Sequence, residues 1–250
     1  MSLIITTYVR EGIVMSSDSR LSINSALVHN ITQTDSVRKT FLTENGIGIS
    51  TCGAADVKGV PISGFVDSFI SEEIGNKRFI VEDVADKLMN YFKLIDPELN
   101  TIFHVAGYDK MLEVDRTNEK NQIDKSAVAI VKTIHKQSIY IIEIKTGTKI
   151  DIIQTRNPQD TVFHGETKAI ARLLNTATIQ HAGQSTPLPF NGIPYSFFTL
   201  QDAIDFNRFV IQTTIDAMRF ELAYKTVGGP IDVLVIKPEK VEWISKKNLI

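Results

Sequence analysis

The sequence predicts an α+β fold in which two antiparallel sheets stack face to face between two helical layers, a four-layer αββα sandwich. Strand-like segments come in consecutive blocks, and each block is followed by helical segments, as in antiparallel sheets rather than alternating βαβ units. Strands such as LIITTYV and AVAIVKTI are apolar on both faces, so each sheet must be covered twice. No linker, repeat or low-complexity tract interrupts residues 1–250, so we expect a single domain.

The elements follow one another along the chain in a regular order. The first is a hairpin of residues 3–9 and 13–19, with Gly12 in its turn region. Pro61 must start or kink the first helical segment. The remaining segments, in order, are strands at 37–43 and 46–51, helices at 54–74 and 81–95, strands at 101–109, 126–134, 138–144 and 149–155, helices at 167–176 and 199–223, and strands at 230–236 and 240–244.

Composition narrows the classes of function. The net charge of -2 gives no electrostatic reason to expect nucleic acid or an anionic membrane as a partner. Cys52 is the only cysteine, which excludes an internal disulfide and makes the cytoplasm the expected location. The start of the chain lacks a signal-peptide pattern, and no apolar run reaches the roughly 20 residues that span a bilayer. The five histidines show no metal-ligand spacing, so we expect no metal site.

The first hairpin is expected to bring a carboxylate to the start of the chain. If its turn is centred on the Arg-Glu pair, paired residue numbers sum to about 20 or 21, and Asp18 comes level with Ser2 or Leu3. Thr6 and Thr7 lie farther along the hairpin, away from any carboxylate. Ser2 becomes the first residue once the initiator methionine is removed. It would then carry a hydroxyl and a free α-amine.

That pair of groups can perform nucleophilic chemistry. A serine hydroxyl is a weak nucleophile until a base removes its proton, and an α-amine with a pKa of about 7.7 to 8.0 can do so near neutral pH. Lys39 shares a strand face with apolar neighbours, so its ammonium group requires a carboxylate partner. Asp18 is the candidate. The sequence therefore predicts a catalytic group of Ser2, Asp18 and Lys39.

A glycine turn is the candidate substrate pocket. Ser50 and Thr51 precede Cys52 and Gly53 in the segment STCGAAD, which we expect to lie just before a helix N-terminus. The backbone N–H groups of Cys52 and Gly53 are the expected donors to an oxyanion. The thiol of Cys52 is expected to be buried and inert, as lone cysteines beside small residues usually are.

Together these segments resemble the N-terminal nucleophile hydrolases of the proteasome β-subunit superfamily, in element order over nearly the whole chain. The matching marks are Ser2, SDSR with Asp18, VRKTF with Lys39, GISTCGAAD, and VGGPIDVLVI near the end. Among the subfamilies, the chain most resembles the bacterial ancestral β-subunit-like group (Anbu), through SDSR and the VGGPID ending. The resemblance implies peptide-bond hydrolysis without a cofactor and a homo-oligomer built as a ring or an open spiral. It leaves subunit number, substrate and any ATPase partner open.

The sequence departs from the family's pattern at several positions. Serine replaces the usual threonine nucleophile, and Cys52 stands at an oxyanion position where glycine is usual. The aspartate and serine that normally precede the late Gly-Gly pair are missing from ELAYKTVGG. We expect the supporting shell to be made instead by Arg20, Glu166, Thr226 and Gly228.

Three functions remain open on the sequence. The first is a peptidase with Ser2 as nucleophile. The second is an amidase of the same type acting on small amides, which an open, shallow pocket beside Ser50 and Thr51 would favour. The third is a catalytically silent subunit of a homo-oligomeric assembly, which a retained Met1 would favour.

Overall fold

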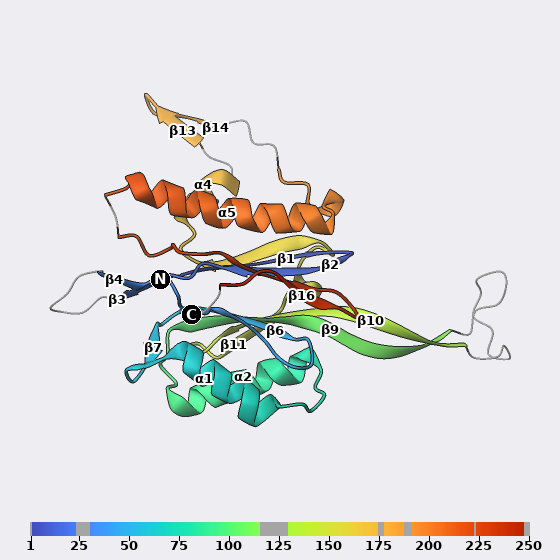
Figure 1. Ribbon diagram of the computed structural model, residues 1–250. Coiled ribbons are helices and arrows are strands. Elements are labelled where there is room, and N and C mark those ends of the chain that lie inside the picture. Colours follow the sequence, from blue (N-terminus) through green and yellow to red (C-terminus); the bar gives the residue numbers. More distant parts are fainter. Residues whose placement is uncertain are drawn as a thin grey trace, which may run out of the picture.

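A computed structural model describes residues 2–23, 31–115, 130–174, 178–187, 192–222 and 224–247. Within these ranges the chain is mixed α and β, with two large antiparallel sheets (Figure 1). In spatial order, the first sheet contains β12 (Asp160–Gly165), β1 (Leu3–Val9), β2 (Gly12–Ser17), β15 (Asp232–Ile236) and β16 (Val241–Ser245). The second contains β11 (Thr148–Asp151), β10 (Ile130–Glu143), β9 (Thr101–Asp115), β6 (Gly48–Gly53) and β5 (Thr40–Leu42).

Helices cover the outer face of each large sheet. The strands outside the two large sheets pair as short hairpins. The helical elements are α1 (Ile62–Ser68), the π-helix η1 (Phe69–Ile74), α2 (Val81–Ile95), α3 (Ile152–Thr155), α4 (Lys168–Leu174), the 3-10 helix η2 (Tyr195–Phe197) and α5 (Leu200–Phe220). The small hairpins pair β3 (Leu21–Ile23) with β4 (Ile31–Thr34), β7 (Asp56–Val57) with β8 (Val60–Pro61), and β13 (Thr178–His181) with β14 (Gln184–Pro187).

Three apolar interfaces order the layers. Met15 and Leu234 of the first sheet pack against Ala106 and Ile139 of the second, so the sheets face each other. One outer core joins the second sheet to α1, η1 and α2, and the opposite one joins the first sheet to α4 and α5. All residues of β1 and β2 are buried, which confirms that these strands are covered on both faces. The arrangement is compatible with the four-layer sandwich (Figure 1).

The structure corrects three predicted elements. Residues 54–61 are not helical, because Lys58 and Gly59 take positive φ angles in the turn of β7–β8, and Pro61 is the N-cap of α1. The strands expected at 126–134 and 138–144 are one strand, β10, over their described part, while 126–129 lie outside the described residues. The strand expected at 149–155 ends at Asp151, whose side chain caps α3.

Among the described residues, no helix combines the length and the apolar character needed to cross a membrane.

Candidate active site

The β1–β2 register brings Asp18 to the start of the chain. Ile4 pairs with Ser17, so paired numbers sum to 21 and Asp18 follows level with Leu3. The Leu3 N–H donates to Asp18 Oδ1 at 3.0 Å, and the Asp18 N–H donates to the Leu3 carbonyl at 3.3 Å. Thr7 lies far along this hairpin and donates its hydroxyl proton to Asn207. Asp18 therefore adjoins Ser2, as the hairpin spacing predicts.

The Asp18 carboxylate is fully buried and joins separate segments of the chain. Its Oδ1 accepts from Leu3 N and from Lys39 Nζ, the latter at 2.7 Å. Its Oδ2 accepts from the backbone N–H groups of Arg20, at 3.1 Å, and Gly228, at 3.0 Å. Each oxygen thus has two donors, as a buried carboxylate requires. Gly228 contributes through its backbone, and a Cβ there would lie 2.4 Å from the Arg20 guanidinium.

Lys39 lies at the pocket floor with 4% of its surface exposed. Its ammonium group donates to Asp18 Oδ1 and to the Arg20 carbonyl, both at 2.7 Å. Burial lowers the pKa of Lys39 below its ordinary value, and the Asp18 carboxylate opposes that shift. Since an ammonium group carries three N–H donors, the two described bonds leave one for a group in the pocket.

The backbone of Ser2 is fixed by the end of β12. The Glu166 N–H donates to the Ser2 carbonyl at 2.8 Å. Gly165 takes a φ of +106°, and a Cβ at this position would lie 1.7 Å from the Ser2 carbonyl oxygen. Only glycine fits there. Glu166 therefore supports Ser2 through its backbone N–H. The residue in HGET that could have indicated this contact from the sequence is the glycine, Gly165, because the close approach to Ser2 requires it.

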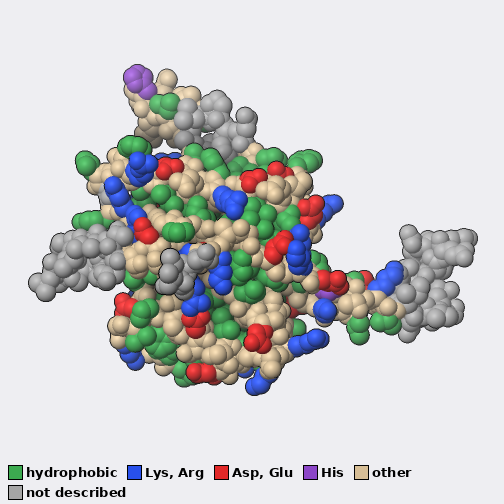
Figure 2. Space-filling model, in the orientation of Figure 1, with side chains coloured by type: hydrophobic (Ala, Val, Ile, Leu, Met, Phe, Trp, Pro, Cys, Tyr) green, Lys and Arg blue, Asp and Glu red, His purple; other side chains and the backbone are tan. Residues whose placement is uncertain are grey.

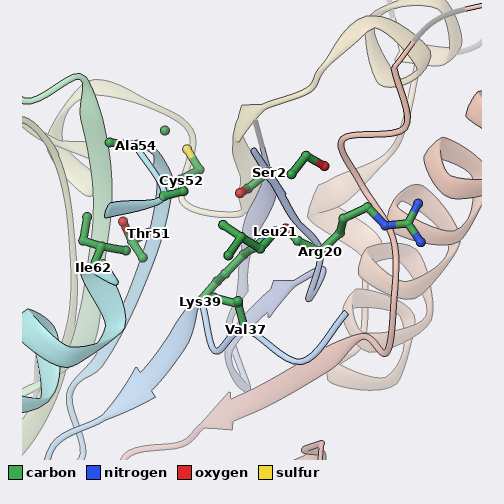
Figure 3. A pocket seen from close by; sticks show the side chains of 12 residues that line it. Ser2, Arg20, Leu21, Val37, Lys39, Thr51, Cys52, Ala54 and Ile62 are labelled. Carbon is green, nitrogen blue, oxygen red and sulfur yellow. The ribbon is translucent and has the colours of Figure 1, made fainter. Parts of the chain in front are cut away.

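A pocket opens beside Ser2, and its lining comes from the residue before β1, from the segment after β2 that includes β3, and from β6 and its flanking residues (Figure 3). Ser2 lies between Lys39 and Cys52 in this view, whereas the guanidinium of Arg20 points away from the pocket. That guanidinium forms two bonds of 2.7 Å with the Asp35 carboxylate, which holds the pKa of Asp35 below its usual value. The lining residues are Ser2, Arg20, Leu21, Ser22, Val37, Lys39, Thr51, Cys52, Gly53, Ala54, Ala55 and Ile62.

The four residues expected to form the pocket on β6 do not all line it. Thr51 and Gly53 line the pocket, but Ser50 does not, because its hydroxyl lies 3.0 Å from that of Thr40. The Thr51 N–H donates to the Lys39 carbonyl, toward β5. Backbone N–H groups alternate in direction along a strand, so that of Gly53 also points to the β5 side, and that of Cys52 points toward Ile102 of β9. Gly53 is the better-placed oxyanion donor of the two.

The surroundings of this pocket change one expectation and agree with another. The turn does not precede a helix N-terminus, because β7 and β8 come between Gly53 and Ile62. Cys52 is 4% exposed, as expected, and burial raises the pKa of its thiol to about 12, which keeps the thiol protonated at neutral pH. The Thr226 hydroxyl is buried and has no hydrogen-bond partner among the described residues.

Polar groups that the sequence analysis missed lie close to the site. Lys247 and Asp232 form another buried ion pair, and Asp232 pairs with Ser17, the residue before Asp18. Between the sheets, His104 Nε2 lies 2.7 Å from His164 Nδ1. Burial lowers the pKa of both imidazoles, that of His104 well below its ordinary value. Among the described residues, no group of three or more His, Cys, Asp or Glu could hold a metal ion.

No protein-family model matches the chain, and no curated protein matches its sequence. The site itself must therefore support any function. It combines a serine hydroxyl near the start of the chain, a buried lysine–aspartate pair, the backbone of Gly53 in the pocket lining and an opening to solvent. These groups can carry out acyl transfer.

Proposed function

We propose that this protein is a proteasome-like N-terminal nucleophile hydrolase that cleaves peptide bonds. The observation that carries the proposal is the buried Lys39–Asp18 pair, because Asp18 also holds the backbone of Leu3, the residue next to Ser2. A lysine buried on a carboxylate is costly unless it is well bonded, and pairs of this kind often mark functional sites. The layer order of helices and sheets supports the same class.

Removal of Met1 would free the α-amine of Ser2. In the first step the amine accepts the proton of the Ser2 hydroxyl, directly or through a water, while Oγ forms a bond to the substrate carbonyl carbon. The carbonyl oxygen becomes an oxyanion, to which the Gly53 N–H donates. The α-ammonium then protonates the leaving amine as the C–N bond breaks. This leaves an ester on Ser2.

Water completes the cycle. The α-amine, neutral again, takes a proton from water as the hydroxide attacks the ester carbonyl. Collapse of the second tetrahedral intermediate returns the proton to Oγ and releases the carboxylic acid. Lys39 contributes a positive charge beside Ser2, which lowers the pKa of the hydroxyl and so favours loss of its proton. The same charge keeps the α-amine neutral near neutral pH, as a base must be, and makes the α-ammonium a stronger acid toward the leaving amine. Asp18 holds that charge in place.

The test compares Ser2 variants in hydrolysis of fluorogenic peptides and of small anilide amides. We expect Ser2→Ala to lose at least about a hundredfold in kcat/KM, because no other hydroxyl carries the α-amine, and Ser2→Thr to retain activity. Ser71→Ala, which changes an exposed serine on η1, is the matched control. Activity in Ser2→Ala equal to the control refutes the proposal. Cleavage of the anilides alone indicates an amidase, and no hydrolysis by the wild type indicates a silent assembly subunit.

A further inference from the structure

The backbone of Arg20 lies between the charged groups beside Ser2 and one wall of the pocket. Its N–H donates to Asp18 Oδ2 at 3.1 Å, and its carbonyl oxygen accepts from Lys39 Nζ at 2.7 Å. The next residue, Leu21, begins β3 and lines the pocket. The position of this one backbone segment therefore affects both the lysine charge and the pocket wall.

The side chain of Arg20 forms an ion pair with Asp35, at the other end of the β3–β4 hairpin. Its Nε and Nη2 atoms each donate to one Asp35 carboxylate oxygen at 2.7 Å. This two-bond geometry is among the strongest that arginine forms, and it fixes direction as well as distance. Arg20 precedes β3 and Asp35 follows β4, so the pair closes the base of the hairpin. Two residues later Val37 also lines the pocket.

Two glycines allow the ion pair to lie where it does. A Cβ at Gly228 would lie 2.4 Å from Arg20 Cζ, so the guanidinium lies directly against this glycine. A Cβ at Gly229 would lie 2.8 Å from the Cβ of Asp35, and the φ of +75° at Gly229 also favours glycine. Each member of the pair thus has one glycine against it. The close approach of the ion pair accounts for both glycines of the VGGP segment.

The surroundings distinguish this pair from an ordinary surface ion pair. Acidic and basic side chains lie close together in many places on the face that Figure 2 shows, and such exposed pairs usually contribute little. The side chain of Arg20 is only 19% exposed. Gly228, which lies against it, also donates its N–H to Asp18 Oδ2 at 3.0 Å and accepts from the Ser19 N–H at 2.9 Å. The ion pair therefore shares its supporting backbone with the Asp18 carboxylate.

The guanidinium of Arg20 takes no part in the proton transfers. It points away from the pocket (Figure 3), so any effect on the reaction must pass through the Arg20 backbone. The hydrogen bonds from Arg20 hold the pKa of Asp35 below its usual value, which is itself far below neutral. The pair is therefore charged at every pH at which the α-amine of Ser2 titrates.

We propose that the Arg20–Asp35 pair positions Lys39 for the reaction at Ser2. The inference rests on the proposed function, because Ser2 must be the nucleophile for Lys39 to act on it. Without the pair, the backbone at residue 20 is free to shift, and the lysine that donates to its carbonyl shifts as well. A misplacement of about 1 Å in an active site can lower the rate about a hundredfold. Loss of the pair should therefore reduce kcat while the protein stays folded.

The test measures kcat and KM for peptide hydrolysis, and the melting temperature, on variants of the full chain. Arg20→Ala removes the guanidinium, and Asp35→Asn removes its carboxylate partner. Asp67→Asn is the matched control, because Asp67 pairs with Arg38 and is 45% exposed, against 40% for Asp35. We expect the first two variants to lose about tenfold to a hundredfold in kcat, with a smaller change in KM and the melting temperature of the control.

Added guanidinium separates positioning from a purely structural role. At a concentration far below that which unfolds the protein, guanidinium chloride should restore kcat in Arg20→Ala, because the free ion can occupy the vacated place beside Asp35. It should not restore Asp35→Asn, which has kept its own guanidinium. Sodium chloride at the same concentration should restore neither variant.

Gly228→Ala separates geometry from charge, and it tests the inference even if Arg20→Ala does not fold. Its methyl group pushes the guanidinium aside, while every charge and the Gly228 N–H remain. We expect it to lower kcat as Arg20→Ala does. The double variant should show no further loss, because the guanidinium is already gone, and guanidinium chloride should not restore it.

The outcomes separate this inference from the proposed function. If the wild type hydrolyses peptides and both Arg20→Ala and Asp35→Asn keep the kcat of the control, this inference alone is refuted. A fall in kcat that follows a fall in melting temperature, and that guanidinium does not relieve, would show that the pair only stabilises the fold and would also overturn it. A wild type that hydrolyses no peptide refutes the proposed function and this inference with it.

Discussion

Replacing Asp18 by Asn removes one charge from the centre of the proposed site while keeping the shape of the side chain. The carboxylate accepts four hydrogen bonds, two on each oxygen. An amide has one oxygen, so its NH2 group must face two donors and two bonds are lost. The Lys39 ammonium, 4% exposed, would also lose its counter-charge.

Breaking a buried ion pair by removing one partner costs about 3 to 5 kcal/mol of unfolding free energy. For a chain of this size each kcal/mol corresponds to about 2 to 4 °C, so we expect the melting temperature to fall by roughly 6 to 20 °C. Urea unfolding measures the loss of unfolding free energy directly. The urea concentration at the midpoint should fall, while the slope of unfolding free energy against urea concentration stays unchanged. Asp67→Asn is the matched control, because Asp67 pairs with Arg38 at the surface with 45% of its side chain exposed. That change should cost less than about 1 kcal/mol.

The double variant Asp18→Asn with Lys39→Met keeps the reasoning testable if Asp18→Asn does not fold. It removes both charges together, so no uncompensated charge remains, and we expect it to be more stable than Asp18→Asn alone. A cost for Asp18→Asn no larger than that of Asp67→Asn would refute the account of a buried network around Asp18.

Three further predictions concern the same region. Gly165→Ala should destabilise more than Gly59→Ala in urea unfolding, because both have positive φ but only Gly165 has the Ser2 carbonyl at its Cβ position; equal costs would contradict this. His104 stays neutral when buried but binds a proton in the unfolded chain below pH 6.5, so stability should fall on acidification by up to about 1.4 kcal/mol per pH unit from this residue. His104→Gln should remove this contribution to the pH dependence of stability. An unchanged pH dependence in the variant would contradict the assignment to His104. With a pKa of about 12, Cys52 should resist iodoacetamide at pH 8 until urea unfolds the protein, and rapid labelling of the native state would show otherwise.

The first hairpin, and the position of Asp18 beside Ser2 that it produces, could be predicted because both depend on local rules. The turn fixes the register, the register fixes the partner of each residue, and the observed sum of 21 lies within the expected range. Lys39 could be predicted because a lysine on an apolar strand face needs a buried carboxylate.

The rest depends on contacts that no local pattern encodes. The Ser2 carbonyl bonds to a backbone N–H of Glu166, so the identity of that side chain gives no signal. Asp35 reaches Arg20 and Lys247 reaches Asp232 only through the fold. The β7–β8 turn was missed because Lys58 adopts a positive φ that its residue type rarely takes. The continuous strand β10 was missed because His135, Lys136 and Gln137 are polar, as residues of a ribbon that extends beyond the rest of its sheet can be.

The central claim is that Ser2 provides both nucleophile and base. The most direct measurement is the intact mass of the native protein before and after incubation with a peptide epoxyketone, whose two bonds require a hydroxyl and a free α-amine on one residue. The account predicts loss of Met1, followed by addition of one full inhibitor mass that maps to Ser2 and is absent from Ser2→Ala. Retention of Met1 in the native protein, or an adduct that maps to any other residue, would contradict it.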